Sequence, residues 1–191
     1  MLYSGNKEEF RDLINDYICE LTKWNKKIRL TGYKDETQIR EKLIEANIKA
    51  VREVDLKGDG ADIGSGNGSL MIAIKAIYPQ LKIYCVERTK KKAAIIEKII
   101  KQLKIHNVYV IAEDLITMEP KYQWDWVIMR EVKLDKKLIT AIKKQTTQNA
   151  KIYIITSACK AEKLKQSDLL DIKHIVKITE NLSLIKAQCF M

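Results

Sequence analysis

Hydrophobic residues in the first fifty positions recur at steps of three and four, as they do along one face of a helix. This spacing predicts an amphipathic helix over residues 7–28, and Lys23, Lys26 and Lys27 lie on its polar face. The Thr31-Gly32 pair interrupts the pattern. A second helix is predicted over residues 35–51, where Asp35 is placed to cap the first turn.

From residue 57 onward, short apolar runs alternate with amphipathic segments. Strands are predicted over residues 61–63, 82–86, 108–112, 124–129 and 150–156, and helices over residues 69–78, 90–103 and 136–146. Such alternation is typical of an α/β fold, a mostly parallel sheet with helices on both faces. Two final runs, 172–179 and 183–190, flank the polar turn at 180–182 and predict a closing antiparallel hairpin. We expect one domain over residues 1–191, with N-terminal helices at 1–56 and an α/β core at 57–191.

The composition is strongly basic, with a formal net charge of +10 over 191 residues. A basic surface attracts phosphate polymers such as RNA, although a general lysine bias of the source organism would give the same excess. No apolar run approaches the ~20 residues of a membrane span. Residues 1–8 hold no apolar stretch of a signal peptide. We therefore expect a cytoplasmic protein without membrane contact.

The four cysteines are widely separated in the sequence, at Cys19, Cys85, Cys159 and Cys189. Because none forms a C-x-x-C pair, we expect neither a metal site nor a disulfide framework. Cys85 lies inside the apolar run IYCV, which favours a buried thiol.

The most informative motif is ADIGSGNGS at residues 61–69. Glycines at alternate positions after a strand allow a sharp turn and a close approach of the backbone to a ligand. The spacing differs from the G-x-G-x-x-G of a dinucleotide-binding turn. An acid followed by G-x-G-x-G resembles the first motif of the class I methyltransferases that use S-adenosylmethionine. A glycine-rich turn without a ligand is the alternative interpretation.

Ligands of an open parallel sheet bind beyond the carboxyl ends of its strands, so residues at those ends are site candidates. A helix beginning near Ser69 would direct its positive end at the cofactor carboxylate. Glu87 follows the second strand, 19 residues after Gly68, where an acid can accept both ribose hydroxyls. An exposed surface glutamate is the alternative. Glu113 and Asp114 follow the third strand and could hold an adenine amino group.

Arg130 follows the fourth strand and is predicted to face the same cleft. It is a candidate anchor for the cofactor or for a phosphate, and the alternative is an ion pair with Glu131 or another neighbour. No catalytic residue is otherwise assigned.

The segment LTKWNKKIRLTG at residues 21–32 points to one family among the class I methyltransferases. It resembles the N-terminal signature K-W-N-x-x-x-N-L-T of the small-subunit ribosomal RNA guanine-N7 methyltransferases, also called the glucose-inhibited division protein B family. The likeness continues through the glycine motif, the lysines at 90–92 and the spacing to Arg130. It implies a seven-stranded, Rossmann-like class I methyltransferase sheet preceded by helices. It also implies methyl transfer from S-adenosylmethionine to guanine N7, with S-adenosylhomocysteine as the product.

Motif, strand ends and resemblance together give two sets of expected site residues. The expected cofactor-binding residues are Asp62, Gly64, Ser65, Gly66, Gly68, Ser69, Glu87, Asp114, Leu115, Ile116 and Arg130. The residues expected to hold the RNA backbone are Lys23, Lys26, Lys27, Arg29, Lys90, Lys91 and Lys92. Ribosomal RNA or the small ribosomal subunit is the expected partner of a monomeric protein.

The sequence also departs from the family pattern around the expected pocket. KLIEA at residues 42–46 stands in place of His-Phe-x-Asp-Ser, and SLM at 69–71 in place of Phe-Pro-Gly. DLI at 114–116 replaces Arg-Ala-Glu, and MRE at 129–131 replaces Ser-Arg-Ala. Two alternatives therefore stay open: a methyltransferase with another RNA or a small-molecule substrate, and a non-catalytic RNA- or ribosome-binding descendant of the fold.

Overall fold

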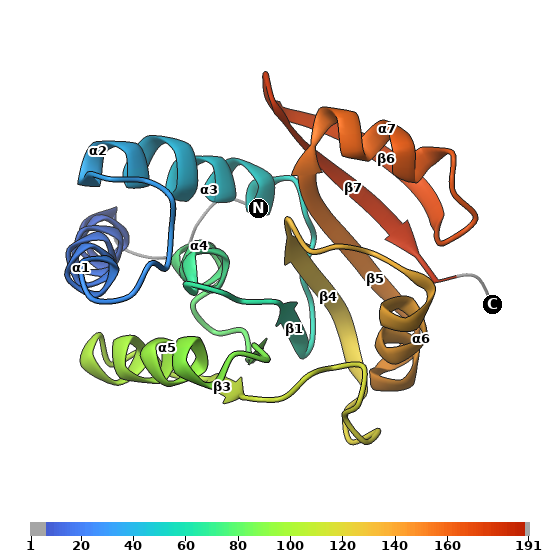
Figure 1. Cartoon of the computed structure of the whole chain (residues 1–191), viewed down its shortest axis with the longest axis horizontal. Coiled ribbons are helices and arrows are strands. Elements are labelled where there is room, and N and C mark those ends of the chain that lie inside the picture. Colours follow the sequence, from blue (N-terminus) through green and yellow to red (C-terminus); the bar gives the residue numbers. More distant parts are fainter. Residues whose placement is uncertain (1–6, 190–191) are drawn as a thin grey trace.

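A seven-stranded sheet forms the centre of the computed structural model, which describes residues 7–189 (Figure 1). Its strand order is β3-β2-β1-β4-β5-β7-β6. The strands are β1 Gly60–Ile63, β2 Ile83–Val86, β3 Val108–Ile111, β4 Trp124–Arg130, β5 Thr146–Ser157, β6 Asp171–Thr179 and β7 Leu182–Gln188. β1 to β5 run parallel, while β7 runs antiparallel to both β5 and β6. The predicted fold class and closing hairpin are confirmed.

Helices cover both faces of this sheet, and Figure 1 shows them in two groups. The first group is α1 Lys7–Asn25, α2 Glu36–Gln38, the π-helical segment η1 Ile39–Ile44, α3 Glu45–Arg52, α4 Ser69–Ile77 and α5 Lys90–Gln102. The second group is α6 Lys136–Gln145 and α7 Ala158–Lys165. Each group has its own apolar core against the sheet. Because one core joins Tyr17, Val51, Met71 and Ile128, the N-terminal helices and the sheet are packed together.

The first helix ends three residues earlier than its apolar stripe predicts, because Asn25 turns the chain. The Asn25 Oδ1 atom accepts hydrogen bonds from the backbone N–H groups of Leu30 and Thr31, at 2.8 and 2.9 Å. Its Nδ2 donates to the carbonyl of Tyr33 at 3.2 Å. The asparagine of the family-like segment therefore folds the connection between the first two helical stretches.

The second predicted helix is present but changes its winding. Asp35 caps it as expected, since its Oδ1 accepts from the backbone N–H of Gln38 at 2.8 Å. The middle segment, η1, is a π-helix, a rare geometry that is frequent near functional sites.

Helix α7 was not predicted from the sequence. Its residues ACKAEKLK offer only Ala161 as a buried position, so the apolar stripe is too narrow to show. The local signal is Ser157, whose side chain accepts from the backbone N–H of Lys160 and caps the helix.

Two further boundaries concern the chain ends and the β3–β4 connection. The last predicted strand extends to Phe190, which lies outside the described residues. Residues 1–6, part of the segment 1–8 considered above for a signal peptide, also lie outside them. Residues 112–123 form no helix, as predicted, so no helix of this connection covers β2 and β3 on the α6 side.

Among the described residues no helix is both long and apolar enough to cross a membrane.

Two glycine substitutions test the tight packing at the start of β1. A Cβ on Gly60 would lie 2.0 Å from Cδ2 of the buried Trp126 ring, whereas a Cβ on Gly32 has no atom within 4 Å. We expect Gly60→Ala to lower the free energy of unfolding by about 1–3 kcal/mol, the usual cost of overpacking. Gly32→Ala should change it by less than about 0.5 kcal/mol. Urea denaturation measures both, and equal effects would contradict this account.

Candidate functional site

The glycine motif forms a left-handed turn at the carboxyl end of β1. The backbone N–H groups of Gly64 and Ser65 donate to the carbonyl of Val86, at 2.8 and 3.2 Å, which fixes the turn against the end of β2. Gly64 has φ +71°, and a Cβ there would meet Val132 Cγ2 at 2.7 Å. A side chain at this position would therefore be strained and would clash. The predicted sharp turn at the strand end is confirmed, and the close approach of its backbone to a ligand stays a prediction.

Asp62 lies beneath this turn and is 1% exposed. The Ser65 hydroxyl donates to its backbone carbonyl at 2.8 Å, but the carboxylate Oδ2 atom has no hydrogen-bond partner in the described structure. Burial, with a smaller contribution from the Glu87 charge, raises the pKa of Asp62 to about 7. An unpartnered buried acceptor is costly, and its position under the glycine turn suits a polar ligand group.

Glu87 lies at the end of β2 and holds two backbone segments together. Its Oε2 accepts from the N–H of Gly66 at 2.9 Å, and its Oε1 accepts from the N–H of Thr89 at 2.8 Å. The residue is 6% exposed, so the alternative of an exposed surface glutamate is wrong. Each oxygen keeps acceptor capacity for a ligand hydroxyl.

A pocket of about 490 Å³ opens beside these groups at the carboxyl ends of the strands. Its wall contains five of the expected cofactor-binding residues: Gly64, Glu87, Asp114, Leu115 and Ile116. Asp114 shapes the wall, because its Oδ1 accepts from the N–H of Ile116 at 3.0 Å. Ile116 is 44% exposed and offers the pocket a large apolar surface.

Sequence reasoning missed part of this wall. Glu131 and Val132, directly after β4, line the pocket, and Glu131 has the left-handed φ of 54°. Non-glycine residues in that conformation are uncommon and cluster at functional sites. Lys92, expected to contact RNA, also lies in the pocket wall.

Arg130 points toward the N-terminal helices. Its guanidinium donates to the Asn47 side chain at 2.6 Å, and to the backbone carbonyls of Leu43 and Lys42 at 3.1 and 3.3 Å. The alternative of an ion pair with Glu131 is wrong, because Glu131 pairs with Lys160. Burial lowers the pKa of Arg130. Its part in anchoring a cofactor or phosphate stays a prediction, since it is not part of the pocket wall.

The remaining expected cofactor residues are not part of the pocket wall, and the N-terminal helices contact two positions of this segment. Ser69, at the start of α4, accepts from the fully buried Asn47 Nδ2 at 3.1 Å. Tyr17 donates from its hydroxyl to the carbonyl of Asn67 at 3.0 Å. Asn47 and Tyr17 belong to no recognisable sequence motif, and only the fold places them beside the glycine turn and the start of α4. Gly68 has φ +82° and begins α4 without a side-chain cap.

The residues expected to bind RNA differ in their local contacts. Lys23 is paired with Glu20 at 2.7 Å, and Lys27 lies over the Trp24 ring at 5.1 Å. Lys26 and Arg29 line a groove of about 440 Å³ beside the turn that follows α1. Lys90 and Lys91 are exposed at the start of α5. The part of these seven residues in RNA binding stays a prediction.

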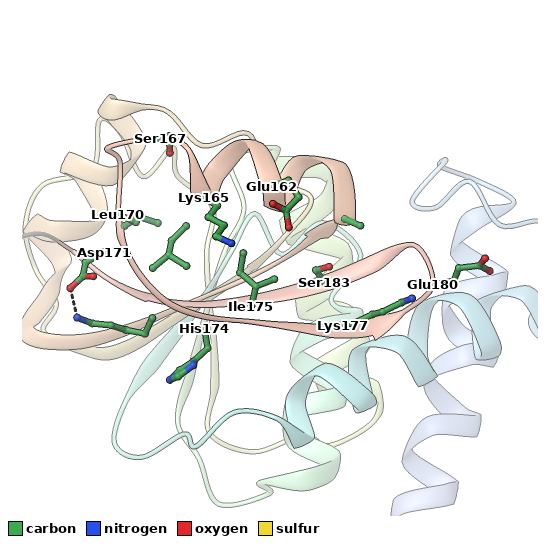
Figure 2. Close-up of a pocket in the computed structure, with 13 residues that line it drawn as sticks. Glu162, Lys165, Ser167, Leu170, Asp171, His174, Ile175, Lys177, Glu180 and Ser183 are labelled. Carbon is green, nitrogen blue, oxygen red and sulfur yellow. Dashed lines mark hydrogen bonds and ion pairs between the residues drawn. The ribbon is translucent and has the colours of Figure 1, made fainter.

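A larger hollow, of about 820 Å³, lies away from all the expected site residues (Figure 2). Glu162 and Lys165 of α7 lie on one side of it, and strands β6 and β7 on the other. Figure 2 shows His174 on the opposite side of these strands from Glu162. The charges here are mixed, with Asp171 paired to Lys173, so size alone does not make this hollow the site.

Comparison with known proteins decides the family. The family GidB, described as rRNA small subunit methyltransferase G, matches residues 11–187. The chain belongs to this family. The predicted resemblance is confirmed, and GidB is a class I methyltransferase family.

Curated relatives agree with this placement, and a solved structure shares the fold. The small-subunit methyltransferase G of Geotalea uraniireducens is 33% identical over 117 residues, which cover 60% of this chain and 53% of that protein. The one from Mesoplasma florum is 28% identical, covering 93% of this chain and 76% of the relative. An S-adenosylmethionine-dependent methyltransferase from Aquifex aeolicus shares the fold with a TM-score of 0.68, at 15% identity, covering 91% and 98% of the two chains. The chain spans about half the length of the first of these relatives.

The GidB pocket has groups that fit S-adenosylmethionine. Glu87 offers carboxylate oxygens for ribose hydroxyls, and exposed Ile116 offers an apolar surface for a flat base. Asp62 also has an unpartnered acceptor, Oδ2, but it is 1% exposed and is not part of the pocket wall. No cluster of three or more metal-ligating side chains is present among the described residues.

The raised pKa of Asp62 gives a pH-dependent stability. Between its ordinary pKa of 3.8 and the folded value of about 7, the folded protein binds more protons than the unfolded chain. Asp62 therefore lowers stability progressively as the pH rises through this range. The asparagine introduced by Asp62→Asn does not titrate, so the free energy of unfolding of this variant should not fall in this way. We expect the difference in free energy of unfolding between Asp62→Asn and the parent to shift by about 2 kcal/mol in favour of the variant from pH 5 to pH 7.5. Urea denaturation at both pH values measures this, and a difference that stays constant would contradict it.

Proposed function

We propose that this chain transfers a methyl group from S-adenosylmethionine to a guanine N7 of small-subunit ribosomal RNA. The observation that carries the proposal is the family match over residues 11–187, joined to a glycine turn and a buried glutamate at one pocket. We propose further that it acts in the cytoplasm and as a monomer.

The chain's own residues would bind the cofactor from several sides. The Glu87 carboxylate accepts the ribose hydroxyls, and Leu115 and Ile116 form the apolar wall beside the base. Gly64 lets the turn pack against Val132, because a Cβ there would lie 2.7 Å from Val132 Cγ2. The backbone carbonyl of Asp62 accepts from the Ser65 hydroxyl at 2.8 Å and so helps to hold the turn. S-adenosylmethionine, when bound, supplies an electrophilic methyl group on a positively charged sulfur.

Guanine N7 suits the groups present in this pocket. It carries an in-plane lone pair, so it can accept a methyl group without first losing a proton, and no general base is needed. The described pocket wall contains no histidine or cysteine, and this step does not require proton transfer to its acids, which are Glu87, Glu113, Asp114, Glu131 and Asp135. The protein's task is then to align the guanine and exclude water, an effect that can contribute ~7–11 kcal/mol.

Methyl transfer to RNA provides the direct test. Labelled S-adenosylmethionine and small-subunit ribosomal RNA from a strain lacking this modification are incubated with the protein, and the labelled nucleotide is then identified. We expect label at guanine N7. Label at another atom would contradict the N7 assignment, and binding of RNA without any transfer would favour the non-catalytic alternative.

Cofactor binding can be tested separately at Glu87. We expect Glu87→Gln to weaken S-adenosylhomocysteine binding by about 10–100-fold, because charge-assisted hydrogen bonds contribute about 1.5–3 kcal/mol. Isothermal titration calorimetry measures the change. Glu162→Gln, the same substitution in the hollow beside α7, is the matched control and should bind as the parent does. Parent-like binding by Glu87→Gln would remove Glu87 from the cofactor site.

A further inference from the structure

Four aromatic rings gather on the face of β2 and β3 that no helix of the β3–β4 connection covers. Tyr84 and Tyr109 are cross-strand neighbours and stack with centroids 5.4 Å apart. Tyr122 lies 4.9 Å from Tyr84 and stacks on the buried Trp124 at 5.0 Å. Tyr109 is therefore the outer member of a supported aromatic stack.

The outermost ring of this stack is open to solvent. Tyr109 is 49% exposed and, among the described residues, one of two large hydrophobic side chains that are exposed. The other is Ile116, which already has a place in the cofactor pocket. β3 is an edge strand of the sheet, so no further strand covers Tyr109 from that side.

A fixed cation accompanies the rings. The ammonium of Lys82 lies 5.2 Å from the centroid of Tyr84 and 5.8 Å from that of Tyr109. Asp59 holds it at 2.7 Å, and hydrogen bonding to Asp59 and to Tyr84 raises the pKa of Lys82. Lys82 therefore stays charged at neutral pH.

Tyr109 also borders a groove of about 480 Å³ between α5 and the edge of β3. Lys101, Lys104 and His106 line this groove, with Glu97 as its one acidic residue. All three basic side chains belong to exposed residues. A basic groove thus continues from the aromatic stack around the edge of the sheet.

We propose that the Tyr84–Tyr109 stack and the adjoining basic groove bind single-stranded RNA. An unpaired base would stack on Tyr109, while Lys101 and Lys104 would contact the phosphates that follow it. Exposed aromatic rings on a sheet, next to cations, are the means by which proteins bind unpaired bases. Basic side chains outnumber acidic ones in this groove, so it suits a polyanion better than a protein surface of mixed charge. The net charge of +10 on the whole chain favours a polyanion as well.

The position of this surface relates it to the pocket. Tyr109 lies three residues before the loop that carries Glu113 and Asp114, a distance of about 10 Å along a strand. The inference rests on the proposed RNA substrate. It adds a contact for the RNA flanking the modified nucleotide, on a surface separate from the cofactor pocket.

The test uses the full chain and a fluorescein-labelled single-stranded RNA of about ten nucleotides, followed by fluorescence anisotropy. We expect Tyr109→Ala to weaken binding about tenfold and Tyr109→Phe, which keeps the stacking ring, to stay within about twofold. A duplex of the same sequence should not distinguish the two variants. Lys101→Gln with Lys104→Gln should reduce the slope of log affinity against log salt by about 1.4.

Calorimetry with S-adenosylhomocysteine separates this inference from the proposed function. All variants should bind S-adenosylhomocysteine as the parent does, which also shows that they are folded. Loss of RNA affinity in Tyr109→Ala supports the inference even if no methyl transfer is found. Unchanged affinity of Tyr109→Ala overturns it even if transfer to RNA is confirmed, and so does a parent protein that does not bind the probe.

Discussion

The pocket depends on the hydrogen bonds that join the carboxyl ends of β1 and β2. The carbonyl of Val86 accepts two backbone N–H groups of the glycine turn, and the carboxylate of Glu87 accepts a third. The parallel pairing of Ile63 with Val86 brings these groups to the same level of the sheet. The carboxylate proposed to bind the ribose is therefore also part of the scaffold that shapes the turn. Its orientation is set before any ligand arrives, which reduces the entropy cost of binding.

A second set of polar contacts joins the N-terminal helices to this scaffold. Asn47, on α3, donates to Ser69 and accepts from Arg130, so one buried amide links three elements. Buried polar groups of this kind are stable only when their partners are correctly placed. The hydrogen bonds therefore favour one position of α3 against the sheet, which apolar packing alone would specify less strictly.

Most of the sheet and the glycine turn could be predicted, because both are encoded locally. Apolar runs of three to eight residues mark the predicted strands, and Gly64, Gly66 and Gly68 all have the positive φ that glycine adopts readily. The partners of Arg130 could not be predicted, because its contacts to Asn47 and Leu43 join residues more than eighty positions apart. The tyrosine stack was missed for the same reason. In sequence, Tyr84 and Tyr109 are ordinary strand residues, and only the pairing of β2 with β3 makes them neighbours.

The hydrogen bond from the Tyr17 hydroxyl to the Asn67 carbonyl connects α1 directly to the middle of the glycine turn. Helix α1 also carries Lys23, and Lys26 follows it in the next turn of the chain. A shift of α1 away from the sheet would break this bond and leave a buried phenol without its partner, which is costly. The position of the glycine turn is therefore set in part by a residue fifty positions earlier in the chain, on a helix that contributes no residue to the pocket wall.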